Sequence, residues 1–263
     1  MSAVILDGKL TAGAIKAELA SKVAELKQRN IHPGLGTLLV GQDPGSLSYV
    51  SGKHRDCEQV GVQSIRIDLP ESASEADIRK AIEDLNSAKE VTGFIVQLPL
   101  PAGIDGNSML ELIDPAKDAD GLHPMNLGKL VMNVSGEINS PMPCTPSGII
   151  ELLRRYDVPL RGAKVAVIGR GLTVGRPLGL MLTRKGVDAT PTLLHSASKN
   201  IEASIAEADI VVAALGSPNF VKPEWIKPGA AVLDVGITRS NGKLLGDVDP
   251  AVSNVAGYLS PTP

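Results

Sequence analysis

Apolar residues in the first half of the chain alternate between helical and strand spacing. From Leu10 to Asn30 they recur every three to four residues, which predicts an amphipathic helix, and the apolar run Leu35 to Val40 predicts a buried strand. The next expected elements are a helix over Ser46–Val60, a strand over Ser64–Leu69, a helix from Ser74 to about Leu85 capped by Ser74 with Asp77, and a strand over Gly93–Leu98. This order predicts a parallel sheet covered by helices.

The second half repeats this rhythm after a proline-rich seam at 141–146. Thr145 is the expected N-cap of a helix that continues through Gly148–Tyr156, with Pro146 at its first position. Strands are expected near 164–168, 190–194, 209–214 and 230–235. We place a domain boundary near residue 140. The predicted fold class is α/β, with two α/β domains, 1–140 and 141–263, flanking a cleft, the second a Rossmann-type domain.

The segment Lys164 to Pro177 reads as strand, tight turn and helix. Gly169, Gly171 and Gly175 form a GxGxxxG pattern, one residue longer than the usual dinucleotide fingerprint. Glycine lets a backbone approach a phosphate closely, and the helix start presents unpaired N–H groups to the anion. The segment therefore predicts a dinucleotide site. A glycine turn that packs a helix on a strand and binds nothing is the structural alternative.

The residues around this loop favour NADP over NAD. The second strand of the unit ends in His195-Ser196, where a dinucleotide fold usually carries an acid that holds the ribose 2′-hydroxyl. A carboxylate there would repel a 2′-phosphate, whereas Arg170 and the Ser196 hydroxyl can bind one.

Composition excludes several classes of function. The 263 residues carry 26 Lys+Arg against 29 Asp+Glu, a net charge of −3 that gives no basic excess for nucleic acid. No stretch is long and apolar enough to predict membrane insertion or export, so we expect a cytoplasmic protein. Cys57 and Cys144 lack metal-ligand spacing, and we expect both to serve as small apolar packing residues without a reactive role.

The first domain offers candidate acid–base chemistry. Tyr49 and Lys53 lie four residues apart on one face of a predicted helix, and Gln97 ends a buried strand. A surface lysine beside a packing tyrosine, and a glutamine that serves loop backbone, are the alternatives. Asp118-Ala119-Asp120-Gly121 begins like a calcium loop but has no closing glutamate, so no metal is expected. Asp120 is the better candidate for a ligand's N–H donors, and Asp118 for capping the following turn.

Seven ordered segments resemble the bacterial bifunctional methylenetetrahydrofolate dehydrogenase/methenyltetrahydrofolate cyclohydrolase family over nearly the whole chain. They are YVSGK at Tyr49–Lys53, VQLPLP at Val96–Pro101, DPAKDADGLHP at Asp114–Pro124, PCTPSG at Pro143–Gly148, VIGRGLTVGRP at Val167–Pro177, DVGI at Asp234–Ile237 and GDVD at Gly246–Asp249. The resemblance implies NADP-dependent oxidation of 5,10-methylenetetrahydrofolate to the methenyl form, followed by hydrolysis to 10-formyltetrahydrofolate. A homodimer serving one-carbon metabolism and purine, methionine and histidine biosynthesis is also implied.

The resemblance also implies roles for individual residues. Lys53 would be the catalytic lysine, Gln97 its orienting partner, Tyr49 the ring over the folate and Asp120 the carboxylate that holds the pterin. The implied substrate-binding residues are Tyr49, Lys53, Val96, Gln97, Leu98, Asp120 and Pro263. The implied cofactor-binding residues are Gly169, Arg170, Gly171, Thr173, Val174, Gly175, Ser196 and Ile237.

Two departures from the family pattern bear on these roles. Gly171 stands where the family commonly has serine, which removes one side-chain hydrogen bond to the cofactor. The chain stops at Pro263, before the family's usual glycine-rich segment and C-terminal helix, and we expect a disordered or truncated tail. An NADP-dependent dehydrogenase of another small hydroxyl or carbonyl substrate, or a nucleotide-sensing protein without turnover, are the alternative functions.

Overall fold

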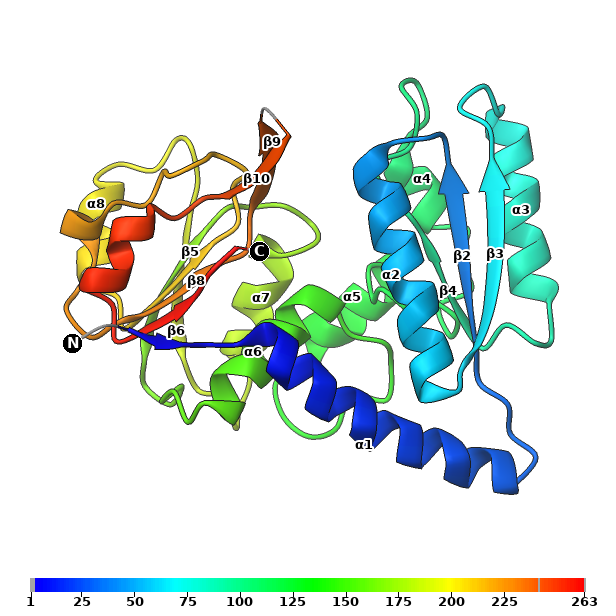
Figure 1. Cartoon of the computed structure of the whole chain (residues 1–263), viewed down its shortest axis with the longest axis horizontal. Coiled ribbons are helices and arrows are strands. Elements are labelled where there is room, and N and C mark those ends of the chain that lie inside the picture. The colour runs from blue at the N-terminus through cyan, green and yellow to red at the C-terminus, as the bar shows by residue number, and fades with distance from the viewer. Residues whose placement is uncertain (1–2, 241, 263) are drawn as a thin grey trace. The chain divides into compact units, whose positions relative to one another are not determined.

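The computed structural model describes residues 3–240 and 242–262, and the chain folds into two compact units (Figure 1). The first unit comprises residues 12–129 and 138–142, and the second comprises the other described residues. Each is built on a parallel sheet, which confirms two α/β domains. The boundary near residue 140 and the cleft stay predictions.

The sheet of the first unit has three parallel strands in the order β3-β2-β4. They are β2 (Gly34–Val40), β3 (Gln63–Leu69) and β4 (Gly93–Val96), and the helices α2 (Pro44–Val60) and α3 (Glu75–Ser87) connect them. Thr37 of β2 bonds a side chain of α2, whereas an added Cβ on the preceding Gly36 would contact Leu85 of α3. Because successive strand residues face opposite sides, α2 and α3 cover opposite faces of the sheet.

The second unit contains a six-stranded sheet in the order β1-β11-β8-β7-β5-β6, with every neighbouring pair parallel. The strands are β1 (Val4–Ile5), β5 (Lys164–Ile168), β6 (Thr190–Leu194), β7 (Ile210–Ala213), β8 (Ala231–Asp234) and β11 (Tyr258–Ser260). An antiparallel hairpin, β9 (Ile237–Ser240) with β10 (Lys243–Gly246), follows β8. The parallel doubly wound arrangement confirms the Rossmann-type domain.

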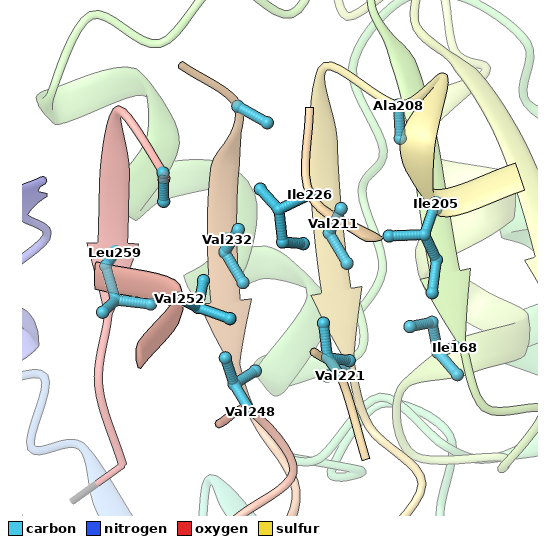
Figure 2. Packing of buried hydrophobic residues seen from close by; sticks show 14 of the residues in the cluster. Ile168, Ile205, Ala208, Val211, Val221, Ile226, Val232, Val248, Val252 and Leu259 are labelled. Carbon is cyan, nitrogen blue, oxygen red and sulfur yellow. The ribbon is translucent and has the colours of Figure 1, made fainter. Parts of the chain in front are cut away.

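Alternate strand residues of the second unit form its main apolar core (Figure 2). Val211 of β7 and Val232 of β8 are fully buried and lie beside Ile226 and Val252 from the covering segments. Those segments are α8 (Ile201–Ala206), η1 (Pro223–Trp225) with Ile226 directly after it, and η2 (Pro250–Asn254). Branched residues in buried parallel strands pack well in this way.

Helices complete both units. The remaining ones are α1 (Gly8–Gln28), α4 (Gly106–Leu110), α5 (Pro124–Met132), α6 (Cys144–Arg155) and α7 (Gly175–Leu182). In the described parts of the chain, no helix combines the length and the apolar character that a membrane span requires.

The capping predictions had different outcomes. Ser74 and Asp77 form the expected reciprocal capping box at the start of α3. Thr145, in contrast, is not an N-cap: α6 begins at Cys144, Pro143 is the N-cap, and no side chain caps the helix. The Pro143 carbonyl oxygen accepts the N–H of Ser147 at 3.0 Å, so the first turn closes before Thr145 can occupy the cap position.

Candidate active site

The geometry around Lys53 begins with the start of α2. Asp43 caps the helix by accepting the N–H of Ser46, and Pro44 occupies its first turn, as expected for a helix that follows a sharp loop. One turn apart on this helix, Tyr49 is 56% exposed and Lys53 is half-buried. The ring therefore offers an open surface one helical turn from a partly buried lysine.

Gln97 meets Lys53 from the sheet. Its N–H continues the strand ladder by donating to the carbonyl of Leu38 at 2.9 Å, which places the side chain at the carboxyl end of β4. Lys53 Nζ donates to Gln97 Oε1 at 3.2 Å, and Gln97 Nε2 donates to the carbonyl of Leu98 at 2.8 Å. The second bond fixes which amide atom faces the lysine, so the ammonium group meets an acceptor.

Asp120 lies close enough to Lys53 to interact with its charge. Burial raises the pKa of this carboxyl above its ordinary value, and the nearby charge of Asp118 adds to the increase, while Lys53 opposes it. Lys53 comes from α2, Gln97 follows the end of β4 and Asp120 lies in the segment between α4 and α5, and all three belong to the first unit. A lysine, an amide and a carboxyl at one place can bind a polar ligand and transfer protons.

The neighbouring Asp118 has a different environment. It is 1% exposed, and its carboxylate accepts the N–H groups of Gly121 and His123 at 3.1 and 2.8 Å and the amide of Asn126 at 2.9 Å. These bonds satisfy its oxygens within the protein and fix the turn that carries Asp120. Of the two substrate-contact candidates beside Gln97, Val96 is buried and Leu98 is half-buried. Pro263 lies outside the described residues.

The glycine loop after β5 shows why glycine is needed at two of its positions. Gly169 has φ +128°, and an added Cβ would overlap the carbonyl oxygen of Ala214. An added Cβ on Gly175 would overlap the carbonyl oxygen of Gly169. The loop therefore folds tightly onto itself before α7, whose N-cap Val174 makes no side-chain capping bond. At the start of α7, Arg176 donates its N–H to the carbonyl of Gly171 at 3.2 Å and Pro177 has no N–H, so Gly175 is the residue of this turn that can offer an N–H to a dinucleotide phosphate.

The other cofactor candidates follow the carboxyl ends of neighbouring strands. Arg170, Gly171 and Thr173 are exposed in the glycine loop, Ser196 is exposed after β6, and Ile237, 42% exposed, begins β9 after β8. Because β5, β6 and β8 are parallel members of one sheet, these residues gather at its carboxyl edge. Among the described residues, no group of three or more His, Cys, Asp or Glu side chains could hold a metal ion.

Two polar clusters were not predicted from the sequence. The ring of His54, next to Lys53, contacts Thr37 Oγ1 at 3.0 Å and Ser64 Oγ on the other side, and so joins α2 to β2 and β3. Asp234 and Asp247 form the second cluster, at the carboxyl end of β8. The DVGI and GDVD segments marked the second cluster, but sequence spacing alone assigned no partners to their carboxylates.

Comparison with known proteins gives two family matches that together span both units. Residues 6–120 match the catalytic domain of tetrahydrofolate dehydrogenase/cyclohydrolase, and residues 143–263 match its NAD(P)-binding domain. Lys53, Gln97 and Asp120 fall in the first matched region, and the glycine loop falls in the second. This division agrees with the chemistry of the two groups of residues.

Solved structures agree over the full chain. The bifunctional enzyme FolD-methylenetetrahydrofolate dehydrogenase/cyclohydrolase from Campylobacter jejuni is 37% identical, with a TM-score of 0.94 covering 100% of this chain and 92% of that one. The Trypanosoma brucei dehydrogenase-cyclohydrolase, solved with NADP and an inhibitor, is 38% identical, with a TM-score of 0.92 covering 100% and 91%. A Bombyx mori 5,10-methylenetetrahydrofolate dehydrogenase is 35% identical, with a TM-score of 0.92 covering 99% and 91%. The chain therefore belongs to the tetrahydrofolate dehydrogenase/cyclohydrolase family.

Proposed function

We propose that this chain oxidises 5,10-methylenetetrahydrofolate with NADP and hydrolyses the methenyl product to 10-formyltetrahydrofolate, with Lys53 as the proton-transfer group of the second step. Family membership supports the two activities. The single observation that supports the role of Lys53 is its hydrogen bond to Gln97. This bond holds the lysine nitrogen at the carboxyl edge of the three-stranded sheet in the first unit. We further assign residues 1–140 to the folate and 141–263 to the cofactor.

The residues of the second unit fit NADP. Gly169 and Gly175 leave no room for side chains where the loop folds back on itself, and Arg170 is exposed in this loop. The Trypanosoma relative was solved with NADP, which supports the same cofactor here. Arg170 and the Ser196 hydroxyl would bind the 2′-phosphate, and Gly171, Thr173, Val174 and Ile237 would complete the site.

The oxidation step requires orientation more than proton transfer. NADP, when bound by the glycine loop, would supply the acceptor for the hydride that leaves the methylene carbon of the folate. The protein's part is to hold the folate in one pose: Asp120 accepts N–H bonds from the pterin, and the open ring of Tyr49 packs against it. Val96, Leu98 and Pro263 are proposed as further substrate contacts. No group of the protein has to gain or lose a proton in this step.

The hydrolysis step does require proton transfer. Water adds to the carbon of the methenyl cation and loses a proton, which gives a neutral hydroxyl adduct. One C–N bond then breaks as its nitrogen takes up a proton and the hydroxyl loses its own proton to solvent, which gives the 10-formyl product and releases one proton overall. Lys53 can accept the first proton in its neutral form and return it to the leaving nitrogen. Gln97 Oε1 keeps the lysine nitrogen within reach through both transfers.

The cellular setting is also a proposal. We infer a cytoplasmic homodimer that supplies one-carbon units to purine, methionine and histidine biosynthesis. Supporting observations are the family membership and the lack, in the described residues, of any helix suited to a membrane span. Size-exclusion chromatography with light scattering tests the dimer, because a monomer mass at micromolar concentration would contradict it.

The test of the function supplies each intermediate separately. Purified protein receives methylenetetrahydrofolate with NADP, or methenyltetrahydrofolate alone, and reduced nicotinamide and the 10-formyl product are measured. The proposal predicts both products in the first reaction and accelerated hydrolysis in the second. Reduction without faster hydrolysis would limit the chain to the dehydrogenase activity.

A further inference from the structure

Two short segments at the carboxyl edge of the six-stranded sheet pack closely against each other. Asp234 ends β8 and is followed by Val235 and Gly236, while Gly246 ends β10 and is followed by Asp247. The β9–β10 hairpin lies between these segments in the chain. Asp234 Oδ1 accepts the N–H of Asp247 at 2.7 Å, so the carboxylate of the first segment fixes the backbone of the second.

Each carboxylate also lies against a glycine of the other segment. An added Cβ on Gly236 would overlap the carboxylate of Asp247, and an added Cβ on Gly246 would overlap that of Asp234. Neither glycine has a positive φ, so the close approach, and not backbone conformation, is what excludes a side chain. The two segments are thus complementary in shape.

Asp247 is the centre of this arrangement. It is fully buried, and its carboxylate accepts three backbone N–H groups, from Leu215 at 2.7 Å, Gly216 at 3.0 Å and Ser217 at 2.7 Å. These residues begin the loop that follows β7. A buried carboxylate with three N–H donors is well satisfied, and its removal would leave those donors without partners.

The loop that Asp247 holds borders the cofactor candidates on two sides. Ala214, directly before it, is the residue whose carbonyl oxygen fills the space beside Gly169. On the other side, Thr238 Oγ1 donates to the carbonyl of Gly216 at 3.1 Å, next to Ile237 in the hairpin. One buried carboxylate therefore connects the glycine loop of β5, the loop of β7 and the hairpin after β8.

We propose that Asp247 is a positioning residue for the NADP site, which sets the spacing between Gly169 and Ile237 by holding residues 215–217. The inference rests on the proposed function only in taking NADP as the ligand. Asp247 itself does not contact the cofactor, because its buried oxygens are occupied by backbone N–H groups. Its effect reaches the cofactor through the loop and the hairpin.

The test uses Asp247→Asn, which places an amide NH₂ where only N–H donors face it. The matched control is Asp249→Asn in the same GDVD segment, because Asp249 caps η2 and asparagine retains that ability. For Asp247→Asn we expect Kd by calorimetry and KM for NADP to rise roughly tenfold or more, since a buried hydrogen-bond group loses its partners. The control should stay within about twofold for both, because asparagine keeps the cap and loses only a partly exposed ion pair with Lys222.

Hydrolysis of methenyltetrahydrofolate without NADP separates positioning from general damage. The residues proposed for hydrolysis, Lys53 and Gln97, lie in the first unit, so Asp247→Asn should hydrolyse methenyltetrahydrofolate at the wild-type rate. A variant that is merely unstable would lose kcat in both reactions as the folded fraction falls, and KM for NADP would not change. A folded Asp247→Asn protein with wild-type affinity for NADP would overturn the proposal.

Thr238→Val keeps the inference testable if Asp247→Asn does not fold. It removes only the bond between the hairpin and the carbonyl of Gly216. We expect a smaller rise in Kd for NADP, about two- to fivefold, as for one partly exposed hydrogen bond. An unchanged Kd in this variant would contradict the proposal, because the bond between the hairpin and the loop of β7 would then have no effect on NADP binding. Calorimetry measures binding without turnover, so failure of the proposed reaction and failure of this inference remain distinguishable.

Discussion

Lys53 Nζ donates a hydrogen bond to Gln97 Oε1 at 3.2 Å, across 44 residues of sequence. The bond joins the middle of α2 to the end of β4, two elements whose positions the three-stranded sheet fixes. Because a second bond from Gln97 to the Leu98 carbonyl sets the amide orientation, the lysine faces an oxygen and not an NH₂ group. The relationship supports a proton-transfer role for Lys53.

Lys53→Met should abolish hydrolysis of methenyltetrahydrofolate while folate still binds. Methionine has similar length but cannot transfer a proton, and loss of such a group typically costs about 10²–10⁴-fold in rate. Stopped-flow measurement of hydrolysis, with calorimetry of folate binding, checks both parts. Lys89→Met, an exposed lysine of the same unit, is the matched control and should retain the wild-type rate. Unchanged hydrolysis in Lys53→Met would exclude the assigned role.

The buried environment of Asp120 leads us to predict that folate affinity depends on pH. Burial raises the pKa of its carboxyl, so this group gains a proton at a higher pH than an ordinary aspartate as the pH falls. The protonated form offers fewer acceptors to the pterin, so KM for folate should rise on acidification in the wild type. Asp120→Asn should have a raised KM that varies less over the same range. Identical pH profiles of KM for both proteins would contradict the role.

Asp118 predicts an effect on stability. Its three hydrogen bonds, to groups at 121, 123 and 126, fix the turn that carries Asp120, so Asp118→Asn leaves an NH₂ group against N–H donors and should lower the free energy of unfolding by about 1–3 kcal/mol. Asp120→Asn should cost less, because its carboxyl is neutralised more easily than an ordinary one. Urea unfolding of the two variants side by side gives the comparison, and an equal loss in both would show that the two carboxyls are not distinguished.

Arg170 predicts a selective effect on the cofactor. Arg170→Ala should raise KM for NADP by roughly 10- to 100-fold, the range for a lost hydrogen bond to a charged group, and should change KM for NAD little. Arg161→Ala, an exposed arginine ahead of β5 and so away from the sheet's carboxyl edge, serves as the control. Parallel loss for NADP and NAD would mean that Arg170 does not bind the 2′-phosphate.

The raised pKa of Asp234 leads us to predict how the free energy of unfolding changes with pH. Burial raises the pKa of this carboxyl from 3.8 to about 6, against the opposing effect of the N–H bonds that it accepts. Between these values the folded protein holds a proton that the unfolded chain has released, so Asp234 makes the free energy of unfolding fall as the pH rises. Asp234→Asn cannot titrate, and its difference in stability from the wild type should change between about pH 4 and about pH 6. Urea unfolding at both ends of this range would refute the assignment if that difference stayed constant.

Local sequence signals predicted most of the fold because they act within one element or one turn. Apolar spacing located the longer strands, and Ser74 with Asp77 located the start of α3. The Thr145 prediction was wrong because the main-chain bond from Ser147 to Pro143 starts α6 two residues earlier than expected. The two- and three-residue strands β1 and β11 carry too few residues to show a period, and their pairing joins the two ends of the described chain.

The candidate site was predictable only where a residue's type indicates chemistry. Lys53, Gln97 and Asp120 were identified by type and by resemblance, and the structure brings them together. Asp247 was not, because its partners Leu215, Gly216 and Ser217 contribute only backbone N–H groups, which leave no trace in the sequence. Contacts of this kind depend on the tertiary fold.

The most direct test follows both products in one reaction, with wild type and Lys53→Met given methylenetetrahydrofolate and NADP. The account predicts that the wild type forms reduced nicotinamide and 10-formyltetrahydrofolate together, whereas Lys53→Met does not accelerate formation of the 10-formyl product. Formation of that product by Lys53→Met at the wild-type rate, or no reduction of NADP by the wild type, would contradict it.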